Sequence, residues 1–145
     1  MNELIKLLDK NLEYVSHSII NDTIFINIKS CRSEVICPYC MHSSIRVHSI
    51  YTRTLQDLPI QDKKVVLVLS NKKMFCDNNN CSRVTFAETF SFYNFKAKKT
   101  KRLESYIFKN SLNVSTVVSA KLLKINVANI SKSTVGNILK KRRTN

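Results

Sequence analysis

Residues 36–40 read ICPYC, and residues 76–81 read CDNNNC. Four thiolates at tetrahedral angles bind Zn²⁺ and leave no open coordination position, which is the arrangement of a structural zinc site. The 35 residues between the two cysteine pairs are enough for two or three strands, whose ends the metal would join. We predict one structural zinc ion with four ligands: Cys37, Cys40, Cys76 and Cys81.

The tetrapeptide CPYC at 37–40 is also the active-site motif of glutaredoxin-like thiol oxidoreductases. In those enzymes a helix begins at the motif, and its N-terminus lowers the pKa of the first thiol. Here residues 41–51 alternate apolar and polar side chains as a strand does. A dithiol enzyme also has no use for a second cysteine pair. We therefore expect no enzymatic activity from this chain.

Three further residues are potential metal ligands. Cys31 is most simply a small buried residue. We expect His42 to be exposed and His48 to be a surface or packing residue, and the sequence assigns none of the three to the zinc site.

The charge of the chain is concentrated in its last third. Residues 1–60 carry six basic and six acidic side chains, whereas residues 96–145 carry thirteen basic and one acidic. Uncompensated positive charge at this density favours a polyanionic partner, most simply double-stranded DNA.

No secretory signal is visible at the N-terminus, and the longest apolar run, VVLVL at 65–69, is too short to span a bilayer. We expect a cytoplasmic, nucleoid-associated protein without a membrane partner.

The first 97 residues show mainly the patterns of strands. We predict a helix over 2–13, a turn over 55–64 that contains Asp57, Pro59 and Asp62, and a loop over 76–81 that contains Asp77. Strands are predicted over 23–29, 44–55 and 64–70, with 72–76 as a continuation or a fourth strand, and 83–93 is extended or mixed.

From residue 98 onward, apolar residues recur at helical spacing, and three groups of them predict three helices. The groups are Leu103, Tyr106 and Ile107; Val114, Val117, Val118, Leu122 and Ile125; and Val135, Ile138 and Leu139. Residues 125–143 resemble the turn and second helix of a helix-turn-helix, with Ser131 as N-cap and Ile130 and Val135 as a hydrophobic staple. The predicted fold is α+β: a zinc-binding, β-rich domain over 1–97 and an all-α helix-turn-helix domain over 98–145.

The last predicted helix carries hydroxyl, amide and basic side chains away from its apolar face. Such side chains suit base edges flanked by phosphates. The predicted DNA-binding residues are Lys132, Ser133, Thr134, Asn137, Lys140, Lys141, Arg142 and Arg143.

The order of these motifs resembles the N-terminal half of ISL-three family transposases from bacterial insertion sequences. The matching positions are Cys37, Cys40, Tyr51, Arg53, Asp57, Leu58, Pro59, Cys76, Cys81, Phe86 and Glu88. One departure is Met41, where the family usually has glycine. The family's full-length members continue into an acidic catalytic domain, and the last fifty residues here contain only Glu104 as an acid.

The resemblance implies sequence-specific binding to the terminal inverted repeats of an insertion element, by a transposase fragment without its catalytic domain. It also implies association as a homodimer or with a full-length transposase. Three alternatives remain open: a stand-alone transcriptional regulator with the same two parts, a zinc-mediated protein-interaction module that binds no DNA, and, against the context of its CPYC motif, a redox enzyme that reduces a disulfide and needs no metal.

Overall fold

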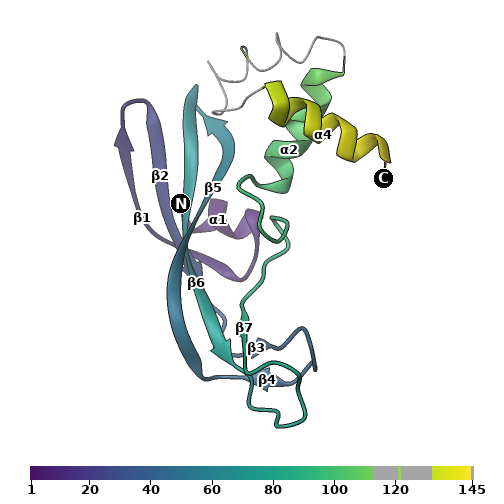
Figure 1. Cartoon of the computed structure of the whole chain (residues 1–145). Helices are drawn as coiled ribbons and strands as arrows, with labels where there is room; N and C mark the ends of the chain where they lie inside the picture. Colours follow the sequence, from purple (N-terminus) through teal and green to yellow (C-terminus); the bar gives the residue numbers. More distant parts are fainter. Residues whose placement is uncertain (113–120, 122–131, 145) are drawn as a thin grey trace. The chain divides into compact units, whose positions relative to one another are not determined.

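The computed structural model describes residues 1–112, 121 and 132–144 (Figure 1). Strands predominate among these residues. The strands are β1 (Leu12–Ile20), β2 (Thr23–Ser30), β3 (Val35–Ile36), β4 (Ser43–Ser44), β5 (Val47–Ile60), β6 (Lys63–Phe75) and β7 (Thr85–Ala87). The helices are α1 (Asn2–Leu8), α2 (Lys101–Ser111) and α4 (Lys132–Thr144).

Five strands form one sheet in the order β1-β2-β6-β5, and β7 pairs with β6 off this path. β3 and β4 form a separate two-stranded sheet. Two-residue turns join β1 to β2 and β5 to β6, and in them Asn21 and Asp22, and again Gln61 and Asp62, have positive φ. Two successive residues in this conformation match the right-handed twist of the flanking strands.

The chain divides into two compact units. Unit 1 comprises Met1–Ser16, Asn27–Thr54 and Val68–Ser91, and unit 2 comprises His17–Ile26, Leu55–Leu67 and Phe92–Asn145. The boundary between the two predicted domains, at residues 97 and 98, stays a prediction.

The predicted helix over 2–13 is too long. The helix α1 ends at Leu8, because Asp9 adopts an extended conformation with φ −157° and ψ 130°. Leu12 is fully buried at the start of β1, a strand that the sequence pattern did not indicate. Leu4 and Leu7 lie in α1 but are exposed, and Ile5 is its buried residue.

The predicted turn over 55–64 is also wrong, since residues 55–60 belong to β5 and the chain turns only at Gln61 and Asp62. Pro59 is tolerated because β5 lies at the end of the strand order, where a missing N–H does not break a central ladder. The segments 64–70 and 72–76 form one strand, β6, that ends at Phe75.

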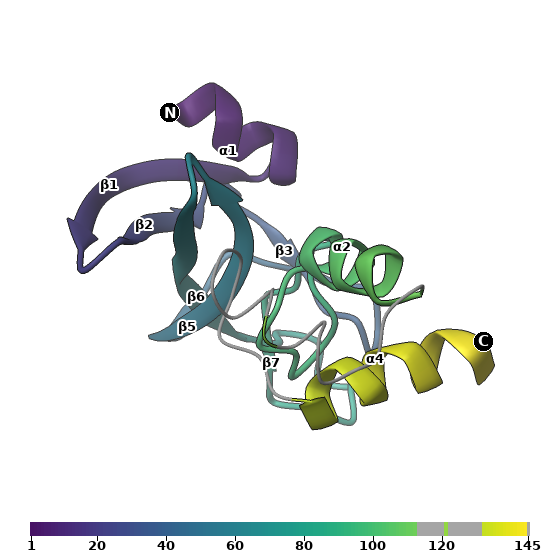
Figure 2. The same cartoon turned by 90° about the horizontal axis from the view of Figure 1, so that it is seen from above.

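The predicted fold class is wrong for the second domain, which was expected to be all-α. Two of the predicted helices are present as α2 and α4, which pack against each other through Leu103, Ile107, Val135, Ile138 and Leu139 (Figure 2). However, the described part of unit 2 is not all-α: Leu58 of β5 packs against the same cluster, and strand segments belong to the unit. The apolar faces of two short helices need more cover than they give each other, and a strand supplies part of it. The predicted second helix and turn, with Ile130 and Ser131, lie outside the described residues.

Hydrogen bonds to Asp57 connect the N-terminus of α2 to β5. Thr100 is the N-cap: its hydroxyl accepts a hydrogen bond from Leu103 N (3.3 Å) and donates one to Asp57 Oδ1 (2.8 Å). Arg102 Nε also donates to Asp57 Oδ1 (2.8 Å), while Arg102 Nη2 donates to Oδ2. These bonds raise the pKa of the Arg102 guanidinium above its usual value. Asp57 is thus a buried anchor for a helix and not the turn-forming residue that we predicted.

Candidate metal centre

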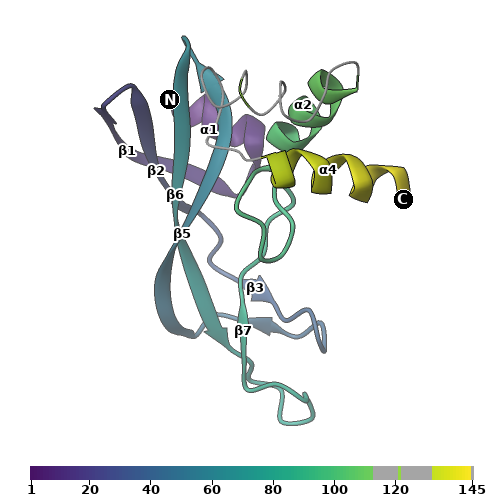
Figure 3. The same ribbon diagram turned by 45° about the horizontal axis from the view of Figure 1, so that its top comes forward.

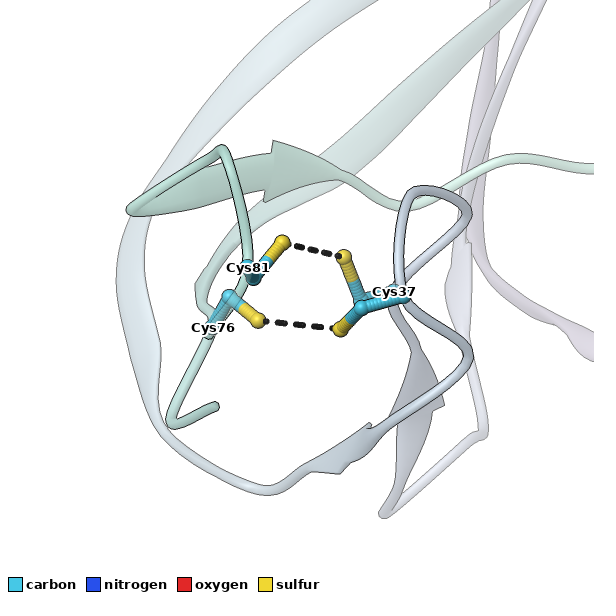
Figure 4. A group of neighbouring side chains, drawn as sticks. Cys37, Cys76 and Cys81 are labelled. Atoms are coloured by element: carbon cyan, nitrogen blue, oxygen red, sulfur yellow. Dashed lines mark hydrogen bonds between the residues drawn. The ribbon is translucent and has the colours of Figure 1, made fainter. Parts of the chain in front are cut away.

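The four predicted cysteines come together in unit 1, as Figure 4 shows for Cys37, Cys76 and Cys81. The Sγ atoms of Cys37 and Cys81 are 3.9 Å apart, those of Cys40 and Cys76 are 3.5 Å apart, and all four lie within 4.8 Å of one another. These separations are far beyond the roughly 2 Å of a disulfide. They bracket the edge of about 3.8 Å of a tetrahedron with Zn–S bonds of about 2.3 Å. The cluster fits one structural Zn²⁺.

The first cysteine pair is shaped by a tight turn between β3 and β4. Met41 N donates to Cys37 O (2.8 Å), and Cys37 N donates to His42 O (2.9 Å). Met41 has φ 63°, in the left-handed region that favours glycine. The turn therefore keeps the backbone conformation for which glycine is the usual residue, despite the methionine side chain.

The second pair is shaped by the loop between β6 and β7. Cys76 N donates to Val84 O (2.8 Å), and Cys81 N donates to Asn78 O (3.0 Å). The Asn78 side chain accepts from Asn80 N (3.0 Å), an interaction typical of asparagine in tight turns. Arg83 N donates to Cys81 Sγ (3.4 Å), so the loop directs an N–H group at a ligand sulfur.

The ligand-bearing turns rest on a small apolar cluster of Val35, Cys37, Met74 and Phe86. Val35, Met74 and Phe86 belong to β3, β6 and β7, which lie close together in Figure 3, and Cys37 directly follows β3. Pairing of Met74 with Phe86 in the antiparallel β6–β7 ladder places both in the cluster. So few buried residues give little stability alone, which indicates that the metal is the main support of this part of the fold.

No helix follows Cys40: the chain passes through a turn into β4, which pairs Ile36 with Ser43 and Val35 with Ser44. The helix N-terminus that lowers the thiol pKa in glutaredoxin-like enzymes is therefore missing at this motif. This agrees with the structural interpretation of CPYC.

The residues left unassigned by the sequence lie outside the cluster. Cys31 is exposed, contrary to the expectation of burial, and its Sγ lies 3.9 Å from Lys6 Nζ. His42 is exposed as expected. His48 is exposed and packs edge-on against Phe75, with ring centroids 4.9 Å apart.

Three of the cysteines in the cluster have shifted pKa values. Burial acts to raise the pKa of Cys40, but hydrogen bonds with Asn78, with the His42 backbone and with neighbouring thiols lower it to about 6. For Cys76 a backbone hydrogen bond at Asn78 acts to lower the pKa, whereas burial and the other thiols raise it to about 12. The pKa of Cys81 is also raised, by burial and by Cys40 and Cys37, against a backbone bond at Arg83. With a pKa of about 6, Cys40 is a thiolate at neutral pH and can bind a cation without first losing a proton.

This difference predicts a change in the pH dependence of zinc binding. Cys76 and Cys81 must each release a proton, so affinity rises by at least about two log units per pH unit above pH 6. Cys40 has a pKa of about 6, so below this pH its thiolate also takes up a proton. The slope of log affinity against pH then increases by about one more unit. Competition with a chromophoric chelator from pH 5.5 to 8 measures this, and a constant slope through pH 6 would contradict the preformed thiolate.

Other residues of the sequence motifs have structural contacts. Tyr51 Oη accepts a hydrogen bond from the buried Asn71 (2.8 Å). Glu88 is buried and accepts from Ser30 Oγ (2.6 Å) and from Arg32 Nη1 (3.4 Å). No sequence pattern indicated these partners of Glu88, because they lie more than fifty residues away from it.

The sequence also missed Thr100 and Arg102, the partners of Asp57. A local signal existed for Thr100, because a threonine directly before an apolar-periodic segment is typical of an N-cap. No comparable signal marks Arg102.

The predicted DNA-binding residues belong to α4. Val135, Ile138 and Leu139 are buried, as the predicted apolar face requires, while Asn137 and Lys140 are exposed and Thr134 is half-buried. The side chains of the other five lie outside the description: Lys132, Ser133, Lys141, Arg142 and Arg143. Their role stays a prediction.

None of the helices in the described ranges is both long and apolar enough to cross a bilayer. No curated protein and no solved structure matches the chain. Residues 33–81 match the family model described as the zinc-finger of transposase IS204/IS1001/IS1096/IS1165. The matched segment contains the four clustered cysteines, and it is similar to the zinc ribbon of DNA-binding proteins that act in transposition.

Proposed function

We propose that this chain binds double-stranded DNA sequence-specifically and recognises the terminal inverted repeats of an insertion element. The observation that carries the proposal is the match of residues 33–81 to a transposase zinc finger, together with a four-cysteine cluster of the right geometry. In this proposal the zinc holds the ribbon in shape, and the chain contributes recognition without breaking DNA strands. In the cell we expect the chain to be associated with the nucleoid. It would act there either as a homodimer or in association with a full-length transposase.

The charge distribution supports DNA as the partner. Residues 96–145 contain thirteen basic side chains and one acidic side chain. Within α4, the burial of Val135, Ile138 and Leu139 leaves Asn137 and Lys140 on the exposed side. Asparagine suits bidentate contact with adenine and lysine suits phosphate, so this face offers both kinds of contact.

Fluorescence anisotropy with labelled duplexes tests the proposal. We expect binding to the ends of the element that encodes the chain to be stronger than to a scrambled duplex, and to weaken steeply with salt. Replacing Lys140 and Lys141 with Gln should reduce the salt slope by about two, because each phosphate contact contributes about 0.9. Lys29→Gln, at an exposed position of β2, is the control for loss of charge.

Asn137→Ala separates recognition from general affinity. Loss of a base contact should narrow the preference for element ends over scrambled DNA by about 1–3 kcal/mol, with the salt slope unchanged. Equal binding of wild type to both duplexes would rule out inverted-repeat recognition. Binding to no duplex would favour the protein-interaction module instead.

A further inference from the structure

A pocket of about 450 Å³ lies in unit 1, beside the C-terminal end of α1. Its polar lining consists of Lys6, Asp9, Lys10, Asn11, Arg32 and Ser91. We propose that this pocket binds a phosphate group of the DNA backbone and so gives the chain a second point of attachment to DNA. The inference rests on the proposed DNA binding for the source of the phosphate, but the pocket itself is argued from its own contacts.

The single carboxylate in the pocket is already satisfied by donors of the protein. Asp9 Oδ1 accepts a hydrogen bond from Asn11 N (2.9 Å), and Oδ2 accepts from Ser91 N and Ser91 Oγ (both 3.2 Å). These three donors offset much of its negative potential. Three cationic side chains line the pocket, and only two carboxylates offset them: Asp9 in the lining, and the buried Glu88 that pairs with Arg32. The remaining positive charge makes the pocket attractive to an anion.

Two of the cations are held in place by the protein. Arg32 Nη1 donates to Thr89 O (2.7 Å) and to Glu88 Oε2 (3.4 Å), and its guanidinium lies over the Phe90 ring, 4.8 Å from the centroid. Lys6 Nζ donates to Leu12 O (3.2 Å) and to Lys10 O (3.4 Å). Because these side chains are ordered before a ligand arrives, binding costs less conformational entropy.

The third cation is available to a ligand. Lys10 is exposed, and its ammonium group makes no hydrogen bond or ion pair within the described part of the chain. An unengaged lysine beside a fixed arginine is a common way to hold phosphate, because the arginine gives direction and the lysine gives charge. Leu7, 80% exposed on the rim, offers apolar surface to a neighbouring deoxyribose. This mixture suits a backbone phosphodiester.

The test uses Lys10→Gln in the whole 145-residue chain, because Lys6 and Arg32 also stabilise the fold. Circular dichroism and zinc content should match wild type. In anisotropy titrations with the element-end duplex, we expect a three- to tenfold loss of affinity near 0.1 M salt and a salt slope smaller by about 0.9. Lys29→Gln has the same change of charge at an exposed site outside the pocket and should leave both values unchanged.

A second measurement does not depend on DNA. Titration of inorganic phosphate, followed by NMR, should shift the Asn11 and Ser91 amide signals in wild type and not in Lys10→Gln. If wild type binds no DNA, the proposed function fails, and these shifts alone decide whether the pocket takes phosphate. Shifts combined with an unchanged DNA salt slope would overturn the DNA backbone as the source. The absence of shifts together with equal DNA binding by both variants would overturn the inference entirely.

Discussion

Replacing Cys81 with Ser is expected to abolish zinc binding and unfold the ribbon around residues 33–48 and 74–87. Serine is a poor zinc ligand, and the remaining three thiols form an open site. The apolar cluster under the site has four buried members, so it cannot replace the contribution of roughly 10–16 kcal/mol from a structural zinc ion. Metal analysis of the purified protein and amide exchange of β6 and β7 measure the two effects.

The chain provides a matched control in Cys31. Its thiol is exposed and contacts only Lys6 Nζ and Lys10 O in the described structure. Cys31→Ser should therefore keep one zinc per chain and change the free energy of unfolding by less than about 0.5 kcal/mol. Zinc retained in Cys81→Ser, or lost in Cys31→Ser, would contradict the assignment of the ligands.

The second large effect is expected for Asp57→Asn. The substitution removes the charge that holds Arg102, and, with the amide oxygen kept at the Oδ1 position, it places an N–H donor opposite Arg102 Nη2. We expect a loss of about 2 kcal/mol, below the value for a fully buried ion pair, because the Arg102 side chain is 47% exposed and stays partly hydrated. Amide exchange should accelerate in α2 and α4, which share the cluster that Leu58 covers.

Asp62→Asn is the control for this change. Asp62 has φ 64° in the turn after β5, and asparagine tolerates that conformation equally well. Stability should change by less than about 0.5 kcal/mol. Arg102→Gln combined with Asp57→Asn should cost less than the sum of the single changes, since neither partner is then left alone. Additive effects would show that Asp57 and Arg102 do not act as a pair.

The zinc site was predictable from the sequence because its information is local. Each cysteine pair shapes its own turn, and two such turns with four thiolates leave one reasonable arrangement. The apolar spacing of Leu103 and Ile107, and of Val135 and Ile138, likewise located α2 and α4 correctly. Local periodicity shows that helices exist, but not what covers their apolar faces.

The errors arose where distant residues decide the structure. Asp57 and Pro59 are typical turn residues, yet one finds its partners some forty-five residues later and the other lies in a strand at the end of the sheet order. Leu12 lay within the predicted helix over 2–13, but it belongs to β1. In each case a long-range contact outweighed a local preference, which no single-sequence pattern records.

The hairpin of β5 and β6 restricts how insertions and deletions can accumulate in related chains. One end of β5 leads from the cysteine turn at Cys40, and near the other end Asp57 must point inward to meet Thr100 and Arg102. Because strand side chains alternate between faces, adding one residue within β5 ahead of Asp57 would turn Asp57 outward. The length of β5 ahead of this aspartate should therefore vary in even steps, unless a β-bulge absorbs the extra residue.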